Sequence, residues 1–146
     1  MMMDRPDKHE YFLNIAKVCA TRSNCYRRAV GCVLVDSHDR ILATGYNGVP
    51  HDFPHCQIGE CPREGKESGT SLNTCHAIHA EQNALLFCSD ICKIKSAYIT
   101  VSPCLACTVM LLNTSCEQII FTDAYPNNDQ ARSLWIMSGR VWAHHG

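Results

Sequence analysis

The sequence predicts an α/β fold with one mixed sheet that begins with a β-hairpin and carries helices on both faces. Two observations lead to this prediction. Short apolar or β-branched runs at 30–35 and 41–46 flank a turn-like stretch at 37–40, and this arrangement is typical of a hairpin. From residue 79 onward helical and strand patterns alternate, and such alternation implies crossovers between parallel strands.

The first helix is expected from about Pro6 to Thr21. Apolar residues recur there at spacings of three and four, and Pro6 suits a first helical turn. After the hairpin, residues 47–75 are rich in Gly, Pro, His and Cys and show little periodicity. So long an irregular stretch is uncommon unless it is functional, and a metal cross-link would explain how it stays ordered.

The remaining elements follow one another at short intervals. Helices are expected at 79–88, 106–112 and 129–137, and strands at 97–101, 118–122 and 139–143. A chain of 146 residues fits one domain, residues 1–146, with a hydrophobic core of its own.

The composition restricts the partners that we expect. The N-terminus lacks the apolar segment of a signal peptide, and no apolar run approaches the roughly 20 residues that span a bilayer. We therefore expect a soluble, cytoplasmic protein without a membrane partner. Eleven cysteines in that compartment stay reduced, which favours metal binding by some of them over a disulfide framework. The formal net charge of −1 supplies no strong field for a polynucleotide.

Two motifs carry the chemistry. His79-Ala80-Glu81 opens one expected helix, and Pro103-Cys104-Leu105-Ala106-Cys107 opens the next. Cys104 and Cys107 are three residues apart, so they lie on one helical face and could share a metal ion with His79. Three protein ligands leave one tetrahedral position open, as in a catalytic zinc site.

Glu81 is the expected catalytic residue. It lies two residues beyond His79, close to the metal but not needed as a ligand. Zinc would lower the pKa of a water molecule towards about 7, and Glu81 could pass protons from water to a ring nitrogen and then to a leaving amine. The combined signature H-x-E and P-C-x-x-C is that of zinc-dependent base deaminases.

Each motif alone is ambiguous. A lone C-x-x-C would also suit a redox pair or half of a zinc ribbon, and a closed structural Cys/His zinc site remains the alternative to a catalytic one.

The sequence resembles the deoxycytidylate deaminase family, of the bacterial and phage type, within the cytidine deaminase-like superfamily. The resemblance runs over nearly the whole chain and rests on Val30-Gly31, the Gly45-Tyr46-Asn47-Gly48 stretch and the two metal motifs. Nucleoside deaminases and RNA or DNA editors lack the Gly-Tyr-Asn-Gly stretch combined with a long Cys/His-bearing loop.

The resemblance implies a three-layer α/β/α sandwich with one mixed five-stranded sheet. It implies hydrolysis of deoxycytidine monophosphate (dCMP) to deoxyuridine monophosphate (dUMP), which supplies thymidylate synthesis. It also implies homo-oligomers, usually hexamers, and regulation by the triphosphates dCTP as activator and dTTP as inhibitor, with Mg²⁺. The small-molecule partners would then be deoxynucleotides. Preference for dCMP over CMP is left open.

Matching the motifs residue by residue implies a substrate site. Asn47 would bond the sugar, and backbone groups of Ala80 and Ser102 would read the base edge. The nucleotide pocket would be lined by Asn83 and Tyr125.

The expected phosphate contact is Arg27, because a guanidinium matches phosphate geometry, and the adjacent Arg28 is an equal candidate. Simpler structural roles remain open for three of the substrate residues. Asn47 could serve an Asn-Gly turn, Tyr125 could be a packing residue and Arg27 a solvated charge.

A second, structural zinc is expected beside this site. In relatives of this type a cysteine at the Cys25 position pairs with one at the Cys56 position around such an ion. Here Cys61 and Cys75 would complete a closed Cys₄ set, and His55 or His76 could replace one of these cysteines. Reduced packing thiols are the alternative.

Three other functions are weighed against this one. A polynucleotide-editing deaminase would need a basic groove and aromatic stacking platforms, which a near-neutral chain with 8% aromatic residues offers little sign of. A nucleoside or guanine deaminase conflicts with the Gly-Tyr-Asn-Gly stretch. A zinc-stabilised binding module without turnover conflicts with an intact Glu81 and an open ligand position.

Overall fold

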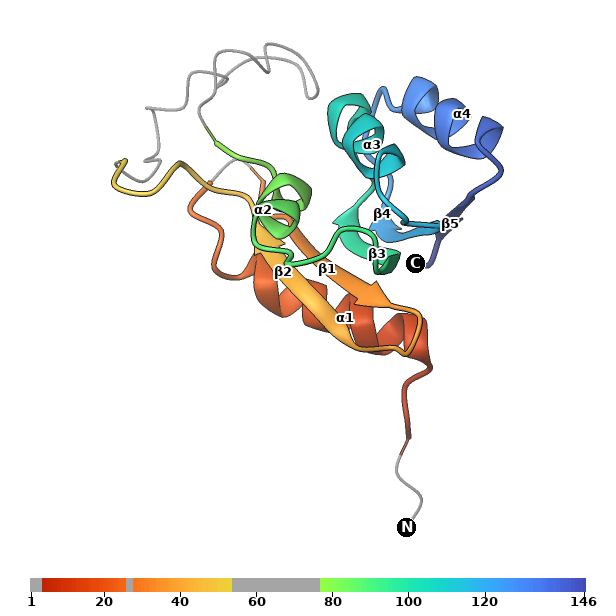
Figure 1. The fold of residues 1–146 in the computed structure, drawn as a ribbon. Coiled ribbons are helices and arrows are strands. Elements are labelled where there is room, and N and C mark those ends of the chain that lie inside the picture. The colour runs from red at the N-terminus through yellow and green to blue at the C-terminus, as the bar shows by residue number, and fades with distance from the viewer. Residues whose placement is uncertain (1–3, 26–27, 54–76) are drawn as a thin grey trace.

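The computed structural model describes residues 4–25, 28–53 and 77–146 (Figure 1). Its helices are α1 (Lys8–Ala20), α2 (Ala80–Leu86), α3 (Leu105–Leu112) and α4 (Asp129–Met137). Its strands are β1 (Gly31–Asp36), β2 (Ile41–Tyr46), β3 (Ile94–Val101), β4 (Gln118–Asp123) and β5 (Val141–His144). None of these described helices has the length and apolar character needed to cross a membrane.

The strands form one mixed sheet in the order β2-β1-β3-β4-β5. The strand β1 is antiparallel to both of its neighbours, β2 and β3. The last three strands, β3, β4 and β5, run parallel, with helices as the connections between them. The predicted mixed sheet with an initial hairpin is therefore confirmed.

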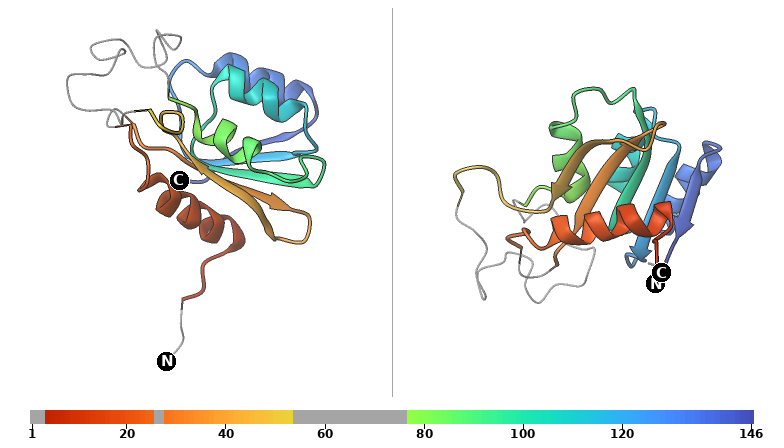
Figure 2. Two further views of the ribbon diagram at one scale, coloured as in Figure 1. Left: turned by 60° about the vertical axis from the view of Figure 1, so that its left-hand side comes forward. Right: turned by 90° about the horizontal axis from the view of Figure 1, so that it is seen from below.

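Helices cover both faces of this sheet, which gives three layers. Figure 2 separates the two faces of the sheet: in the left view the helix α1 lies below the sheet, and α2, α3 and α4 lie above it. Alternation along β1 shows the same division, because Val33 and Val35 pack with α1 residues whereas Cys32 and Leu34 pack with residues of α2, α3 and α4. The α/β/α sandwich is confirmed.

Most elements differ from their expected ranges by one or two residues at an end, and the starts of β5 and β3 have clear structural reasons. The last strand begins at Val141 rather than at 139, because Gly139 has a φ of 84° and its N–H bonds the Ile136 carbonyl at 2.9 Å, so it ends α4. The strand expected from 97 begins at Ile94, which pairs with Asp36 of β1. Pairing with β1 extends β3 back through the polar residues Lys95 and Ser96.

A close approach between α2 and β2 positions the first half of the site. A Cβ built on Gly45 would lie 2.3 Å from the Ala80 carbonyl oxygen and 2.5 Å from the Ala84 nitrogen. Both atoms belong to the helix backbone, so no side-chain movement could make room. The glycine therefore allows α2 to rest directly on β2, where Ala80 and Ala84 are fully buried.

Arg140 holds the far end of α3. Its guanidinium donates to the carbonyls of Leu111 at 3.3 Å, Leu112 at 3.0 Å and Cys116 at 2.9 Å, and it lies 5.0 Å from the ring centroid of Trp135. A cation at the C-terminus of a helix satisfies carbonyls that have no partner within the helix. Arg140 thereby connects α3 to α4 and to the start of β4.

We predict that Gly45→Ala destabilises the fold, because the added methyl group would displace α2 from β2. Overpacking of this kind costs about 1–3 kcal/mol. Thermal unfolding would measure it, with the exposed Thr44→Ala on the same strand as the matched control. A melting temperature equal to that of the control would contradict the close approach.

Candidate metal centre

One imidazole and two thiols meet where α2 and α3 begin. The Nδ1 atom of His79 lies 3.2 Å from the Cys107 sulfur and 3.5 Å from the Cys104 sulfur. The ligand atoms of the three residues all lie within 4.8 Å of one another. Within the described part of the chain this is the only group of three or more His, Cys, Asp or Glu side chains with such geometry. The three residues expected to hold metal are therefore together.

The ends of the two helices bring these residues together. His79 is the N-cap of α2 and Cys104 is the N-cap of α3, while Cys107 lies in the first turn of α3 and is fully buried. The positive end of the helix dipole favours thiolates at these positions. The His79 N–H donates to the Gln82 side-chain oxygen at 3.0 Å, which fixes the backbone of the N-cap. Gln82 thus completes a capping box, which its place three residues after the N-cap indicates.

The pKa values of the two thiols are shifted in opposite directions. Hydrogen bonding with Cys107, and then with His79, lowers the pKa of Cys104 to about 4. Hydrogen bonding with Cys104, together with burial, raises the pKa of the Cys107 thiol. The opposite directions at two adjacent sulfurs mean that, without a cation, one thiolate and one thiol are favoured over two thiolates. A bound cation would favour the thiolate form of both.

The donor set fits zinc. Thiolate and imidazole are the ligands that Zn²⁺ prefers in proteins, and a set of three leaves a position for water or substrate. Hard cations such as Mg²⁺ and Ca²⁺ prefer oxygen ligands instead. The residues present therefore match a catalytic zinc site in number and chemistry.

Glu81 lies inside the structure, next to these ligands. It is in the first turn of α2 and only 4% exposed. Burial raises the pKa of Glu81, while the charge of His79 and hydrogen bonding with Cys107 act in the opposite direction. A carboxyl group whose pKa is moved towards neutrality can both accept and release a proton at physiological pH. The position and environment of Glu81 suit general acid–base chemistry.

Asn47 follows β2, and its side-chain amide is bonded to the backbone that precedes β1. Its oxygen accepts from the Val30 N–H at 2.8 Å, and its nitrogen donates to the Arg28 carbonyl at 2.6 Å. The next residue, Gly48, exchanges two backbone hydrogen bonds with Ile78, at 2.7 and 3.0 Å. Because Ile78 directly precedes the first metal ligand, this bridge joins the segment after β2 to the segment that carries His79. An amide offers two donors and two acceptor positions, so these bonds occupy half of its capacity.

The other expected base and nucleotide contacts surround the same helix ends. Asn83 donates from its side chain to the Tyr46 carbonyl at 2.8 Å, which ties α2 to the end of β2. Ala80 is the first residue of α2, and Ser102 immediately follows β3. The Ser102 N–H donates to the Asp123 carbonyl at 2.9 Å.

The structure pairs Arg28 with Tyr125. The guanidinium carbon of Arg28 lies 5.2 Å from the centroid of the Tyr125 ring, a cation–π contact between the segment before β1 and the loop after β4. Arg27, the other phosphate candidate, lies outside the described residues. Arg28 is therefore the arginine that the structure places next to an expected nucleotide contact.

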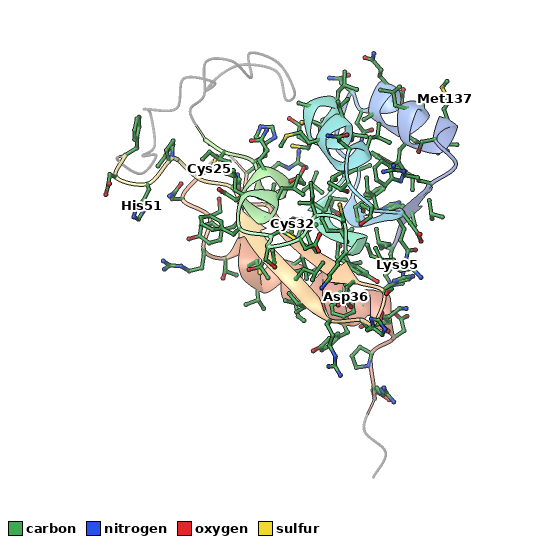
Figure 3. All side chains as sticks on the ribbon, in the orientation of Figure 1. Cys25, Cys32, Asp36, His51, Lys95 and Met137 are labelled. Atoms are coloured by element: carbon green, nitrogen blue, oxygen red, sulfur yellow. The ribbon has the colours of Figure 1, made fainter. Side chains whose placement is uncertain are left out.

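Of the residues expected to bind a second metal ion, Cys25 is the one that lies among the described residues. This half-buried residue donates its N–H to the Ser23 hydroxyl at 3.2 Å, and Figure 3 shows it on the side of the molecule opposite Met137. The other candidates lie outside the described residues: Cys56, Cys61, Cys75, His55 and His76.

Comparison with known proteins gives a consistent set of relatives. The sequence model of the family described as "Cytidine and deoxycytidylate deaminase zinc-binding region" matches residues 6–123. A deoxycytidylate deaminase of Mycobacterium phage D29 is 40% identical over 127 residues, which cover 82% of this chain and 97% of the phage protein. That of Saccharomyces cerevisiae is 36% identical over 129 residues, covering 87% of this chain. This chain spans 41% of the yeast protein's length.

A similar solved structure is that of the dCMP deaminase from the cyanophage S-TIM5 in complex with dCMP and dUMP. It superposes with a TM-score of 0.78 and is 26% identical, and the alignment covers 98% of this chain and all of that one.

Proposed function

Because the chain belongs to the cytidine and deoxycytidylate deaminase family, we propose that it hydrolyses dCMP to dUMP and ammonia. The observation that carries this proposal is a buried carboxyl group, Glu81, beside a His/Cys/Cys set at two helix N-termini. We assign zinc to His79, Cys104 and Cys107. The monophosphate substrate is supported by the phage D29 relative and by the S-TIM5 enzyme, whose structure holds dCMP and dUMP.

Bound zinc would supply a Lewis acid that makes water nucleophilic near neutral pH. Glu81 then moves the protons. It takes one from water and delivers it to N3 of cytosine as oxygen bonds to C4, and it carries the second from that oxygen to the 4-amino group. The C4–N bond breaks, ammonia leaves, and the C4 carbonyl of uracil forms. One water is consumed for each ammonia released.

Backbone groups at two element ends would hold the base. The N–H of Ala80 is in the first turn of α2, where amides have no acceptor within the helix, so it is available to an oxygen of the base. The Ser102 N–H is already bonded to Asp123, so we assign the Ser102 carbonyl to the amino group of cytosine.

The sugar and phosphate would lie towards the segment before β1. We assign the sugar contact to the side chain of Asn47, with Asn83 holding the end of β2 beside it. We assign the phosphate to Arg28, whose guanidinium rests on Tyr125, with Arg27 as a second cation from the same segment. These contacts would favour a monophosphate over a nucleoside.

We further propose a structural zinc held by Cys25, Cys56, Cys61 and Cys75, with His55 or His76 as alternative ligands. The Cys-rich composition of the segment and the resemblance to related deaminases support it. Metal binding there would stabilise a segment that has little periodicity of its own.

The remaining features of the family are proposed for this chain on the same resemblance. They are one deaminase domain spanning residues 1–146, cytoplasmic location, deoxynucleotide rather than polynucleotide ligands, and activation by dCTP and inhibition by dTTP with Mg²⁺. We also propose a homo-oligomer, with a hexamer favoured. Apolar side chains that are exposed on α3 and α4 support self-association: Val109, Met110, Ile136 and Met137.

We predict that Glu81→Gln retains zinc but loses turnover of dCMP by about 10²–10⁴-fold, because the amide cannot carry protons. Ultraviolet absorbance would follow deamination, and metal analysis would follow zinc. The exposed Glu117→Gln is the matched control. Turnover within tenfold of the control would remove Glu81 from its proposed role.

We predict that Arg28→Ala raises KM for dCMP by roughly tenfold or more, because a charged hydrogen bond contributes about 1.5–3 kcal/mol. The KM for deoxycytidine should change little. The exposed Arg132→Ala on α4 is the control. Equal effects on nucleotide and nucleoside would show that Arg28 does not contact the phosphate.

The two proposed zinc sites predict distinct metal contents. The wild-type chain should hold two zinc ions, and Cys104→Ala should retain one of them while losing activity. The exposed Cys92→Ala should retain both. One zinc per wild-type chain, falling to none in Cys104→Ala, would refute the structural site.

A further inference from the structure

The Ser102 hydroxyl joins the metal-bearing end of β3 to the loop after β4. Ser102 is 2% exposed and lies two residues before Cys104. Its oxygen accepts a hydrogen bond from the Tyr125 N–H at 2.7 Å and another from the Asn128 side-chain amide. A hydroxyl oxygen has two acceptor positions, so the loop occupies both of them. The loop is therefore held to Ser102 at two points, one on each side of residues 126 and 127.

Asn128 serves this contact instead of capping its helix. It is the N-cap residue of α4, a position where asparagine normally accepts a hydrogen bond from the first helical turn. Its side chain makes no such bond, and its backbone, with φ −111° and ψ 18°, is not in the extended form usual for an N-cap. The preceding Asn127 has a φ of 63°, in the left-handed region. The local conformation thus directs the amide of Asn128 towards Ser102.

This contact leads to the proposed phosphate ligand. The same hydroxyl that binds Asn128 fixes the backbone of Tyr125, whose ring lies against the Arg28 guanidinium. The main chain of Arg28 is held separately, by the Asn47 amide at 2.6 Å. Two contacts therefore position Arg28: the Asn47 amide holds its main chain, and the Tyr125 ring holds its guanidinium.

We propose that Asn128 is a positioning residue for phosphate recognition. Through Ser102 it fixes Tyr125, and Tyr125 orients Arg28 for the phosphate of a nucleoside monophosphate. It thereby sets the preference for a monophosphate over a nucleoside without touching the base or the metal ligands. This inference rests on the proposed function.

Steady-state kinetics of Asn128→Ala with dCMP and deoxycytidine would test it. We expect KM for dCMP to rise about fivefold, the effect of losing one neutral hydrogen bond, with kcat within about twofold. The kcat/KM for deoxycytidine should stay within about twofold. Asn113→Ala, at an exposed asparagine after α3, is the matched control. An unchanged KM for dCMP, or an equal loss with deoxycytidine, would overturn the proposal.

Two further variants separate positioning from a general structural effect. Asn128→Ser keeps a residue that favours the N-cap but is too short to reach Ser102, so it should raise KM for dCMP while preserving α4. In a Ser102→Ala background, Asn128→Ala should have no additional effect, because the connection is already lost. Additive effects would overturn action through Ser102.

Kinetics of the wild-type protein with dCMP are measured first, so that failure of the proposed function can be told from failure of the role proposed for Asn128. A wild-type protein that does not deaminate dCMP would overturn the proposed function, and this inference with it. A wild-type protein that prefers dCMP, combined with an Asn128→Ala variant that behaves like Asn113→Ala, would overturn the inference alone.

Discussion

The metal centre depends on the close contact between α2 and β2 at Gly45. The helix backbone occupies the space where any other residue would carry its Cβ. This contact fixes the height of α2 above the sheet, and the backbone bridge between Gly48 and Ile78 fixes where the chain enters it. Since His79 follows Ile78, these two contacts place the imidazole opposite the first turn of α3.

The second half of the centre is positioned by the parallel part of the sheet. The strand β3 ends at Val101, and the chain turns through Ser102 into α3, so Cys104 and Cys107 lie at the end of the central strand. Arg140 holds the opposite end of the same helix. The thiols are therefore brought to the imidazole by elements anchored at both ends, which is what a rigid first coordination shell requires.

Ser102, in the turn between β3 and α3, also contacts the loop after β4. Its carbonyl is the group that we propose for the base, whereas its buried hydroxyl accepts a hydrogen bond from the loop that carries Tyr125. A buried hydroxyl that accepts two hydrogen bonds holds both donor groups in place, because neither donor can move away without losing its hydrogen bond. The proposed metal ligands and the proposed nucleotide contacts thus share the short segment from Ser102 to Cys107.

The sequence by itself determined the order and type of the elements, because periods of two and 3.6 residues record which face of each element is buried. It also determined the chemistry of the metal centre, since the spacings of His79, Glu81, Cys104 and Cys107 are local properties of two helix starts. The roles assigned to these residues stay predictions. The tertiary structure alone decided that β3 begins at Ile94 and that the amide of Asn128 turns to Ser102. Both depend on partners distant in the chain, and no local pattern records such a partner.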